Sequence, residues 1–368
     1  MGKRIVLAVA GAGKTYKICE TLNPEKNNLI LAYTHENVKN LVNGLKHFLG
    51  YIPSNTHIMT FDSFIYRYMI NPYLPSICDF FNVENGIKGI TIKEPPQQSI
   101  IVNGYRRKNP YYHTKEKFEH YYNSHGLLYN EYLPDLLMFV KNKDINLVKK
   151  ACMYINEYFD EIFVDEFQDF RETKYKLITE MAKYLNNIML VGDFYQHSVS
   201  GTNNSGIPFK KNKLDVDYND FLDELKKMKF DVDDTSLVKT RRCSKNVSDY
   251  VHNKIGINFS SYDDHSGNVI ILNDNNEIKN ILDDDNIIKL VYENAKNMEF
   301  NALNWSYSKG DTFEDVCVIL TKSLANFTDD TFDSTKISIV TKNKLYVALT
   351  RPKRNLYIIP FNLIKTIL

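Results

Sequence analysis

Ile5-Val6-Leu7-Ala8-Val9-Ala10-Gly11-Ala12-Gly13-Lys14-Thr15 runs from an apolar segment into a glycine turn. The helix-compatible residues after it complete a predicted strand, turn and helix. Backbone N–H groups of such a turn can surround a phosphate, with the side chain of Lys14 on the β and γ phosphates and the Thr15 hydroxyl on Mg²⁺. Ala8 stands where this pattern usually has glycine, and an ordinary left-handed turn that opens a helix is the alternative. The predicted phosphate-binding residues are Ala10, Gly11, Ala12, Gly13, Lys14 and Thr15.

A second stretch, Ile162-Phe163-Val164-Asp165-Glu166-Phe167-Gln168-Asp169, also ends an apolar strand. Its first acid, Asp165, is predicted to hold Mg²⁺ together with Thr15, and Glu166 to orient and deprotonate the attacking water. The alternative is a pair of acids at the start of a surface helix, where they complement its dipole. Because both stretches occur in the same chain and in this order, we predict hydrolysis of ATP.

Composition limits the classes of protein to consider. The chain has 368 residues, 43% of them hydrophobic, which suggests a globular protein of two or three domains. It has 46 basic and 45 acidic residues, so any contact with nucleic acid must come from local patches of charge. The five cysteines are odd in number and show no C-x-x-C spacing, which argues against a disulfide framework and a zinc site.

The sequence has no feature of export or membrane insertion. Gly2-Lys3-Arg4 leads directly into the first predicted strand, and no apolar run reaches the roughly 18 residues that a membrane span needs. We therefore expect a cytoplasmic protein without membrane contact.

Apolar runs alternate with helical patterns, which predicts a parallel α/β fold. The predicted strands are Leu29–Ala32, His57–Met59, Ile162–Val164, Ile188–Val191, Leu237–Lys239, Val269–Leu272, Val316–Leu320 and Leu356–Ile359. The predicted helices include Glu36–Phe48, Lys174–Tyr184 and Tyr218–Met228.

Two segments interrupt this alternation. Residues 66–157 are rich in tyrosine and favour helices, and we interpret them as an insertion in the first domain. Within them, Tyr105–His113 mixes aromatic and basic residues and is either a solvated loop or a part of the insertion that contacts phosphates. Residues 201–234 are polar and are predicted to form a linker with one short helix.

Six further motifs complete an ordered set: Leu31-Ala32-Tyr33-Thr34-His35-Glu36-Asn37, Thr60-Phe61-Asp62-Ser63-Phe64, Val191-Gly192-Asp193-Phe194-Tyr195-Gln196, Thr240-Arg241-Arg242-Cys243-Ser244, Tyr307-Ser308-Lys309-Gly310-Asp311-Thr312-Phe313-Glu314 and Tyr346-Val347-Ala348-Leu349-Thr350-Arg351-Pro352-Lys353. In this order the motifs resemble those of UvrD/Rep-like superfamily 1 DNA helicases. The resemblance extends from residue 5 to about residue 360 and implies two RecA-like parallel-sheet domains with a helical insertion in the first. The implied boundaries are 1–65 and 158–200 for the first domain, 66–157 for the insertion, 201–234 for the linker and 235–368 for the second domain.

The resemblance also implies roles around the nucleotide. Gln196 would sense the γ-phosphate, and Gln168 would belong to the same coupling layer. Arg242 and Arg351 would be arginine fingers, since a planar and permanently charged guanidinium matches phosphate oxygens. Arg241 is the alternative to Arg242, and a solvated charge is the alternative for Arg351. Lys309 and Gly310 would also contact the nucleotide.

For single-stranded DNA, the resemblance implies contacts that do not depend on base sequence, because aromatic rings stack on any base and polar groups hold phosphates. The implied residues are Thr34, Thr60, Phe61, Phe64, Ser308 and Lys309. Packing in the core is the alternative for Phe61 and Phe64.

Two hypotheses for function follow. In the first, the chain is a 3′→5′ ATP-dependent translocase or helicase on single-stranded DNA. In the second, it is a DNA-activated ATPase switch that regulates a protein partner such as a nuclease. Only 65 positions separate Arg242 from Tyr307, too few for the large insertion of full-size relatives, so we expect little unwinding of long duplexes.

Overall fold

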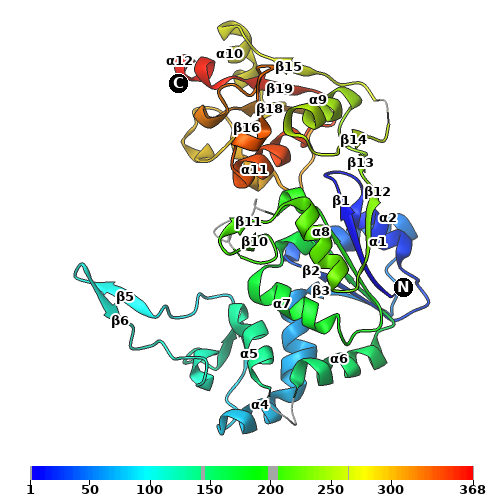
Figure 1. Cartoon of the computed structure of the whole chain (residues 1–368), viewed down its shortest axis with the longest axis vertical. Coiled ribbons are helices and arrows are strands. Elements are labelled where there is room, and N and C mark those ends of the chain that lie inside the picture. The colour runs from blue at the N-terminus through cyan, green and yellow to red at the C-terminus, as the bar shows by residue number, and fades with distance from the viewer. Residues whose placement is uncertain (1, 142–145, 198–205, 264, 368) are drawn as a thin grey trace. The chain divides into compact units, whose positions relative to one another are not determined.

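The computed structural model describes residues 2–141, 146–197, 206–263 and 265–367. The end of the predicted first domain and the start of the predicted linker fall at 198–205 and lie outside the described residues. Strands and helices alternate along much of the chain (Figure 1), and this confirms the predicted α/β class. One of the larger sheets has β9 (Ile188–Gly192), β8 (Glu161–Val164), β2 (Asn28–Ala32) and β3 (Thr56–Thr60) as neighbours in that order. The other has the order β15 (Val269–Ile271), β19 (Leu356–Ile359), β18 (Asp315–Ile319), β16 (Ile287–Val291) and β17 (Ala302–Asn304).

The chain divides into two compact units. Unit 1 comprises Met1–Arg4, Ile18–Glu166 and Phe170–Leu190, and unit 2 comprises Ile5–Lys17, Phe167–Asp169 and Val191–Leu368. The glycine turn that follows β1 (Lys3–Ala8) is therefore part of unit 2.

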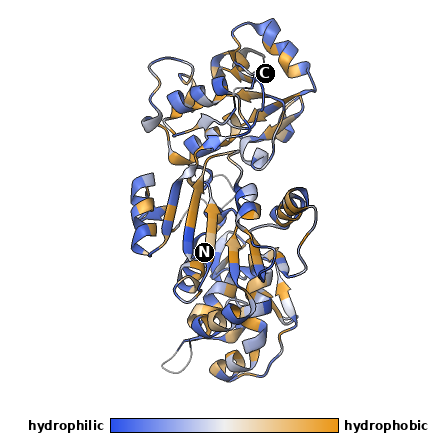
Figure 2. Cartoon of the chain, turned by 90° about the vertical axis from the view of Figure 1, so that its right-hand side faces the viewer, coloured by the Kyte–Doolittle hydropathy of each residue, from blue (hydrophilic) through white to orange (hydrophobic). Residues whose placement is uncertain are grey.

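In unit 1, β2 (Asn28–Ala32) pairs in parallel with β3 (Thr56–Thr60) and with β8 (Glu161–Val164), and β8 pairs with β9 (Ile188–Gly192). Every residue of β2, β8 and β9 is buried, as expected of parallel strands covered on both faces. These strands are largely orange in the hydropathy view of Figure 2. The predictions of strands at these four places are confirmed to within two residues.

Helices connect these strands, and their ends follow from local sequence. Thr34 caps α2 by accepting a hydrogen bond from the N–H of Asn37, and Gly50 ends the helix at φ +81°. The predicted helices near 36–48 and 174–184 are confirmed as α2 and α7. The helices of the N-terminal half are α1 (Lys14–Thr21), α2 (His35–Leu49), α3 (Phe61–Phe64), α4 (Leu74–Phe81), α5 (Leu133–Phe139), α6 (Leu147–Tyr158) and α7 (Glu172–Met181).

The segment predicted as an insertion contains strands as well as helices. Between α4 and α5, β4 (Gly89–Thr91) pairs in parallel with β7 (Leu127–Tyr129). In the same interval, β5 (Ser99–Val102) and β6 (Tyr105–Lys108) form an antiparallel hairpin. Asn103 and Gly104 connect its strands with φ values of 51° and 80°, and two consecutive positive φ values are typical of a type I′ turn. Figure 1 shows this hairpin extending away from the helices around it.

Unit 2 contains a sheet of five parallel strands, whose central position is taken by β18. Its strands are β15 (Val269–Ile271), β16 (Ile287–Val291), β17 (Ala302–Asn304), β18 (Asp315–Ile319) and β19 (Leu356–Ile359). Its helices are α8 (Tyr218–Lys227), α9 (Lys245–Ile255), α10 (Asn275–Asp283), α11 (Ile339–Leu349) and α12 (Phe361–Ile367). The strands predicted near 269, 316 and 356 and the helix predicted at 218–228 are confirmed.

Other parts of unit 2 differ from prediction. Residues 231–237 form β12 beside β1, although Asp231–Asp234 was predicted to be linker. The difference arises because an edge strand needs only its backbone paired, so acidic side chains can stay exposed. A short pair, β13 (Lys239–Thr240) with β14 (Ser260–Ser261), follows. The strands β16 and β17 were not predicted.

The core of unit 2 surrounds Trp305, which is fully buried and donates a hydrogen bond from Nε1 to the carbonyl of Leu290 at 3.0 Å. Ala8, Val9 and Ala10 join this core with residues of α9 and α11. Among the described residues, no helix has both the length and the apolar character needed to cross a bilayer.

Candidate nucleotide and nucleic-acid site

The glycine turn lies directly between β1 and α1, as predicted. Gly11 and Gly13 have φ values of +71° and +93°, which favour glycine. A Cβ atom on Gly11 would lie 2.6 Å from Oγ1 of Thr240 and 2.7 Å from Cβ of Arg242. The Gly11 carbonyl accepts a hydrogen bond from the N–H of Arg241 at 2.9 Å. Glycine is therefore required here both by conformation and by this close approach within unit 2.

Tyr346 connects the same turn to a buried carboxylate. The N–H of Ala10 donates to the Tyr346 hydroxyl at 2.7 Å, and that hydroxyl lies 3.5 Å from Oδ2 of Asp193. Tyr346 is fully buried, and burial followed by the charge of Asp193 raises its pKa well above the usual value. The phenol consequently keeps its proton and can donate to Asp193 while it accepts from Ala10.

Asp193 is the centre of a compact polar group. Its Oδ2 accepts from Nε2 of Gln196 at 2.7 Å, and its N–H donates to Oε1 of Gln168 at 2.9 Å. All three residues are nearly inaccessible to solvent. A Cβ on Gly192 would lie 2.7 Å from Oε1 of Gln168, so glycine at this position leaves room for that amide. The structure thus brings the predicted coupling residues Gln168 and Gln196 together around one carboxylate.

Lys309 forms an ion pair with Asp169, the residue that follows Gln168. Its Nζ lies 2.5 Å from Oδ1 of Asp169, and only 15% and 9% of the two side chains are exposed. An ion pair with so little solvent is screened less than one on the surface. Gly310 follows with φ +93°, and a Cβ atom added to it would have no neighbour within 4 Å. The backbone conformation, and not a close contact, therefore favours glycine at this position.

Both predicted arginine fingers lie at Thr350. Arg242 donates from Nη1 to the Thr350 carbonyl at 3.1 Å, and Arg351 donates from Nη2 to the Thr350 hydroxyl at 3.2 Å. Arg351 is 1% exposed, and burial, followed by the neighbouring charge of Arg242, lowers its pKa to about 9. It remains charged at neutral pH. Arg241 instead lies with its guanidinium 4.1 Å from the ring centre of Tyr262.

Carbonyl oxygens hold the rest of the Arg351 guanidinium. Its Nε donates to Val347 at 2.8 Å, and its Nη1 donates to Ser308 at 3.2 Å and to Asp311 at 3.1 Å. The side chain is therefore fixed inside unit 2 and is not a solvated charge.

Asp165 and Glu166 directly follow β8 in unit 1. Asp165 is 4% exposed, and its N–H pairs with the carbonyl of Leu31 at 2.8 Å. Glu166 has φ +51°, and its N–H donates to Oδ1 of Asp165 at 3.0 Å. A positive φ outside glycine and asparagine is uncommon, and such strain is concentrated at functional sites.

The donor chemistry fits the predicted cofactor. A carboxylate on Asp165 and a hydroxyl on Thr15 are the hard oxygen ligands that Mg²⁺ prefers. Among the described residues, no cluster of three or more His, Cys, Asp or Glu side chains could hold a metal by itself.

Local structure explains several predicted DNA contacts in unit 1. Thr34 and Thr60 are helix caps that accept from the N–H groups of Asn37 and Ser63. Phe61 and Phe64 are 1% and 0% exposed, with ring centres 6.1 Å apart in a stacked pair. Their environment corresponds to the core-packing alternative, since neither ring has a face open to a base.

Ser308 is also fully buried in unit 2, where its hydroxyl donates to the carbonyl of Trp305 at 2.8 Å. A phosphate contact at this turn would therefore depend on Lys309 more than on Ser308.

Sequence reasoning missed the part played by Tyr346. The residue stands in a quoted motif, but no role was assigned to it. One usable signal was its position four residues before Thr350, the C-cap of α11, because residues at this spacing lie on one face of a helix.

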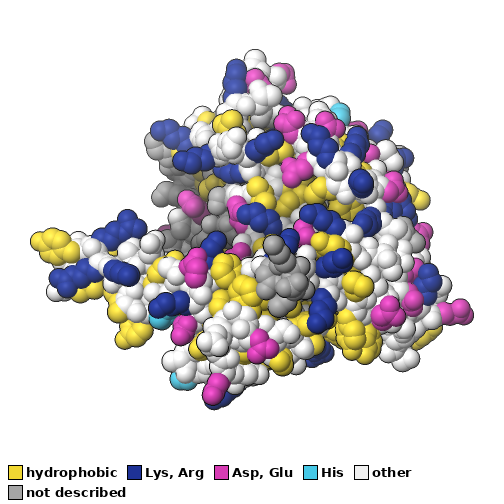
Figure 3. Space-filling view, turned by 60° about the horizontal axis from the view of Figure 1, so that its bottom comes forward, with side chains coloured by type: hydrophobic (Ala, Val, Ile, Leu, Met, Phe, Trp, Pro, Cys, Tyr) yellow, Lys and Arg dark blue, Asp and Glu magenta, His cyan; other side chains and the backbone are white. Residues whose placement is uncertain are grey.

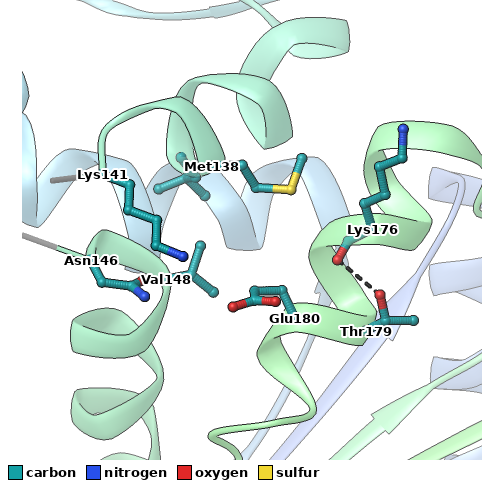
Figure 4. A pocket seen from close by; sticks show the side chains of 8 residues that line it. Met138, Lys141, Asn146, Val148, Lys176, Thr179 and Glu180 are labelled. Carbon is teal, nitrogen blue, oxygen red and sulfur yellow. Dashed lines mark hydrogen bonds between the residues drawn. The ribbon is translucent and has the colours of Figure 1, made fainter. Parts of the chain in front are cut away.

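The described part of unit 1 also contains a cavity of about 340 Å³, lined by residues of α5, α6 and α7 (Figure 4). Its acid, Glu180, pairs with Lys183, and its hydroxyl, on Thr179, donates to the carbonyl of Lys176. No predicted site residue lines it, so it does not contribute to the candidate site.

Comparison with known proteins gives one match to a family model and several to solved structures. Residues 82–198 match the family model described as the UvrD/REP helicase N-terminal domain. These residues are similar to that domain. No curated protein matches the chain.

Two solved structures are similar to the chain over most of its length. They are the "Complex structure of Arterivirus nonstructural protein 10 (helicase) with DNA" and "The structure of PRRSV helicase", each with 13% identity. The matches cover 97% and 98% of this chain, with TM-scores of 0.45 and 0.44, and the chain spans 60% and 52% of the length of those two. At these values the likeness carries no argument about activity.

Proposed function

We propose that the chain is an ATP-dependent translocase of the UvrD type that moves 3′→5′ along single-stranded DNA. The observation that carries the proposal is the path of hydrogen bonds in unit 2 from Ala10 in the glycine turn, through Tyr346, to Asp193 and Gln196. The family match to residues 82–198 supports the helicase class. The polarity is taken from the resemblance to UvrD/Rep-like helicases.

The proposed chemistry assigns one step to each side chain. The turn N–H groups and Lys14 hold the triphosphate. Glu166 takes a proton from a water molecule as the water oxygen attacks the γ-phosphorus. The bond between the γ-phosphorus and the oxygen shared with the β-phosphate breaks, which gives ADP and phosphate. Arg242 and Arg351 offset the charge that develops on the phosphoryl oxygens. Asp165 and Thr15 would hold Mg²⁺, which would offset the negative charge of the phosphates.

The proposed coupling uses the polar group at Asp193. Loss of the γ-phosphate changes the contacts of Gln196 and so alters the hydrogen bond from Gln196 to Asp193. Asp193 is also hydrogen-bonded to Gln168. The next residue, Asp169, pairs with Lys309, which is a predicted DNA contact. Three successive contacts among buried or nearly buried groups thus link a nucleotide sensor to a side chain suited to phosphate binding.

The test is ATP hydrolysis with and without single-stranded DNA at low salt, followed by displacement of streptavidin from one end of a biotinylated oligonucleotide. We expect DNA to accelerate hydrolysis, an effect that salt weakens, and displacement from the 5′ end only. An ATPase that DNA does not stimulate would rule out the translocase. Stimulation without displacement from either end would favour the DNA-activated switch instead.

A further inference from the structure

The β5–β6 hairpin in unit 1 is a two-stranded ribbon without a packing partner among the described residues. Each of its eight strand residues is exposed or half-buried. Ile101 and Tyr105 are 79% and 72% exposed. Isolated ribbons of this kind are marginal in water, and apolar side chains at a projecting tip gain stability only from a further surface.

The base of the ribbon is anchored. Asn109 is 6% exposed, its N–H donates to the carbonyl of Gln98 at 3.1 Å, and its Oδ1 accepts from the N–H of Tyr111 at 3.0 Å. The tight Asn103-Gly104 turn fixes the other end. The ribbon is thus a defined element and not an irregular loop.

Its charge differs from that of the whole chain. Arg106, Arg107, Lys108 and Lys115 are the charged residues from 95 to 115, and no acid interrupts them, whereas the chain as a whole carries only +1. Figure 3 shows the ribbon as an arm at the left of the view, with dark blue cations along it and a yellow tip.

The cations lie on both faces of the ribbon. Residues paired across an antiparallel ladder share a face, and Arg106 is opposite Ile101 while Arg107 is opposite Ile100. Lys108 shares the face of Arg106, and the bond of 2.7 Å from Nε of Arg106 to Oγ of Ser99 agrees with this assignment. A partner that suits the ribbon must therefore offer negative charge on two sides.

From this arrangement we infer that the β5–β6 hairpin inserts into the major groove of duplex DNA. That groove admits a two-stranded β-ribbon, and phosphates line both of its walls. The apolar tip then meets base edges and thymine methyl groups. The inference rests on the proposed function, to which it adds a contact with the duplex beside the single strand.

Other nucleic acids fit less well. A single strand offers one line of phosphates and would leave the cations of one face unmatched. Double-stranded RNA has a deep and narrow major groove that side chains cannot enter, so the ribbon is excluded from it. B-form DNA is therefore the nucleic acid that matches the ribbon.

The experiment measures binding of the full chain, without nucleotide, to a blunt DNA duplex of roughly 20 base pairs, about two helical turns, by fluorescence anisotropy as salt is varied. The test variant is R106A/R107A/K108A. The matched control, K39A/K46A/K149A, removes three exposed lysines from α2 and α6 of the same unit and so changes the net charge equally. The variant R106K/R107K keeps the charge and serves as a second comparison.

Loss of three phosphate contacts makes the slope of log affinity against log salt less steep by about 2.7. Between roughly 50 and 200 mM salt, the affinity of the variant should therefore fall by a factor about 40-fold smaller than that of the unmodified chain. We expect this change in the test variant, none in the control and little in R106K/R107K. Binding of an RNA duplex and of a single strand should change much less than binding of DNA. Equal effects in test and control variants, or equal losses on all three nucleic acids, would overturn the inference.

The same variants separate this inference from the proposed function. Hydrolysis stimulated by single-stranded DNA should persist in R106A/R107A/K108A, because the ribbon carries none of the proposed nucleotide or single-strand contacts. If the unmodified chain shows no such stimulation, the proposed function fails. If stimulation is present but duplex binding ignores the ribbon, only the inference fails.

Discussion

Removal of one oxygen atom tests the bond between the glycine turn and α11. In Tyr346→Phe the ring keeps its edge contacts with Tyr195 and Phe259, but the N–H of Ala10 loses its acceptor. Ala10 is 1% exposed, so water cannot replace the hydroxyl. A buried donor left unpaired costs about 1–3 kcal/mol. For a unit of this size, we expect the melting temperature to fall by roughly 2–12 °C.

Tyr250 provides the matched control. It is a partly buried tyrosine of unit 2, and its buried hydroxyl has no hydrogen-bond partner in the described part of the chain. Tyr250→Phe removes the same atom without breaking a bond, and it should leave the melting temperature unchanged or raise it slightly. Calorimetry of the full chain and the two variants gives the comparison. If both variants melt at the same temperature, the hydroxyl of Tyr346 does not stabilise the turn and the reasoning is refuted.

Further predictions concern coupling, chemistry and unwinding. In Gly192→Ala the new methyl group displaces the amide of Gln168 from Asp193. Single-stranded DNA should then stimulate ATP hydrolysis less, while the ATPase rate without DNA changes little. Unchanged stimulation would contradict the proposed coupling path. Glu166→Gln should still bind ATP but lose hydrolysis, whereas Lys14→Ala should weaken the binding of ATP. Equilibrium binding and turnover assays distinguish the two effects. Near-normal turnover in Glu166→Gln would show that Glu166 is not the base. On a duplex of several tens of base pairs with a 3′ tail, the chain alone should separate strands poorly, and efficient processive separation would show that residues 66–157 suffice as the accessory element.

The sequence revealed most strands because buried parallel strands are continuous apolar runs. This signal fails where a strand contains charge. Lys289 interrupts β16, yet it is 1% exposed because its Nζ donates to the carbonyl of Asp284 at 2.9 Å. In β12 the acids outnumber the apolar residues. Neither compensation can be read from the sequence pattern.

The candidate site was predictable in its parts and less so in its connections. The glycine turn has local requirements, and its position between strand and helix followed from the residues alone. The bond from Ala10 to Tyr346 spans 336 positions, and no local pattern specifies such a pair. Similarly, Phe61 and Phe64 have the residue type that stacks on bases, and only their burial indicates packing in the core.

The way Arg351 is held has a mechanical consequence. A lysine could not replace it, because its ammonium donors radiate from one nitrogen, whereas this guanidinium spans acceptors on separate stretches of backbone. Two of these acceptors are the carbonyls of Ser308 and Asp311, which flank Lys309 and Gly310. These two hydrogen bonds hold the turn at residues 308–311 to the Arg351 guanidinium. Movement of the guanidinium would therefore also move the backbone on both sides of Lys309 and Gly310.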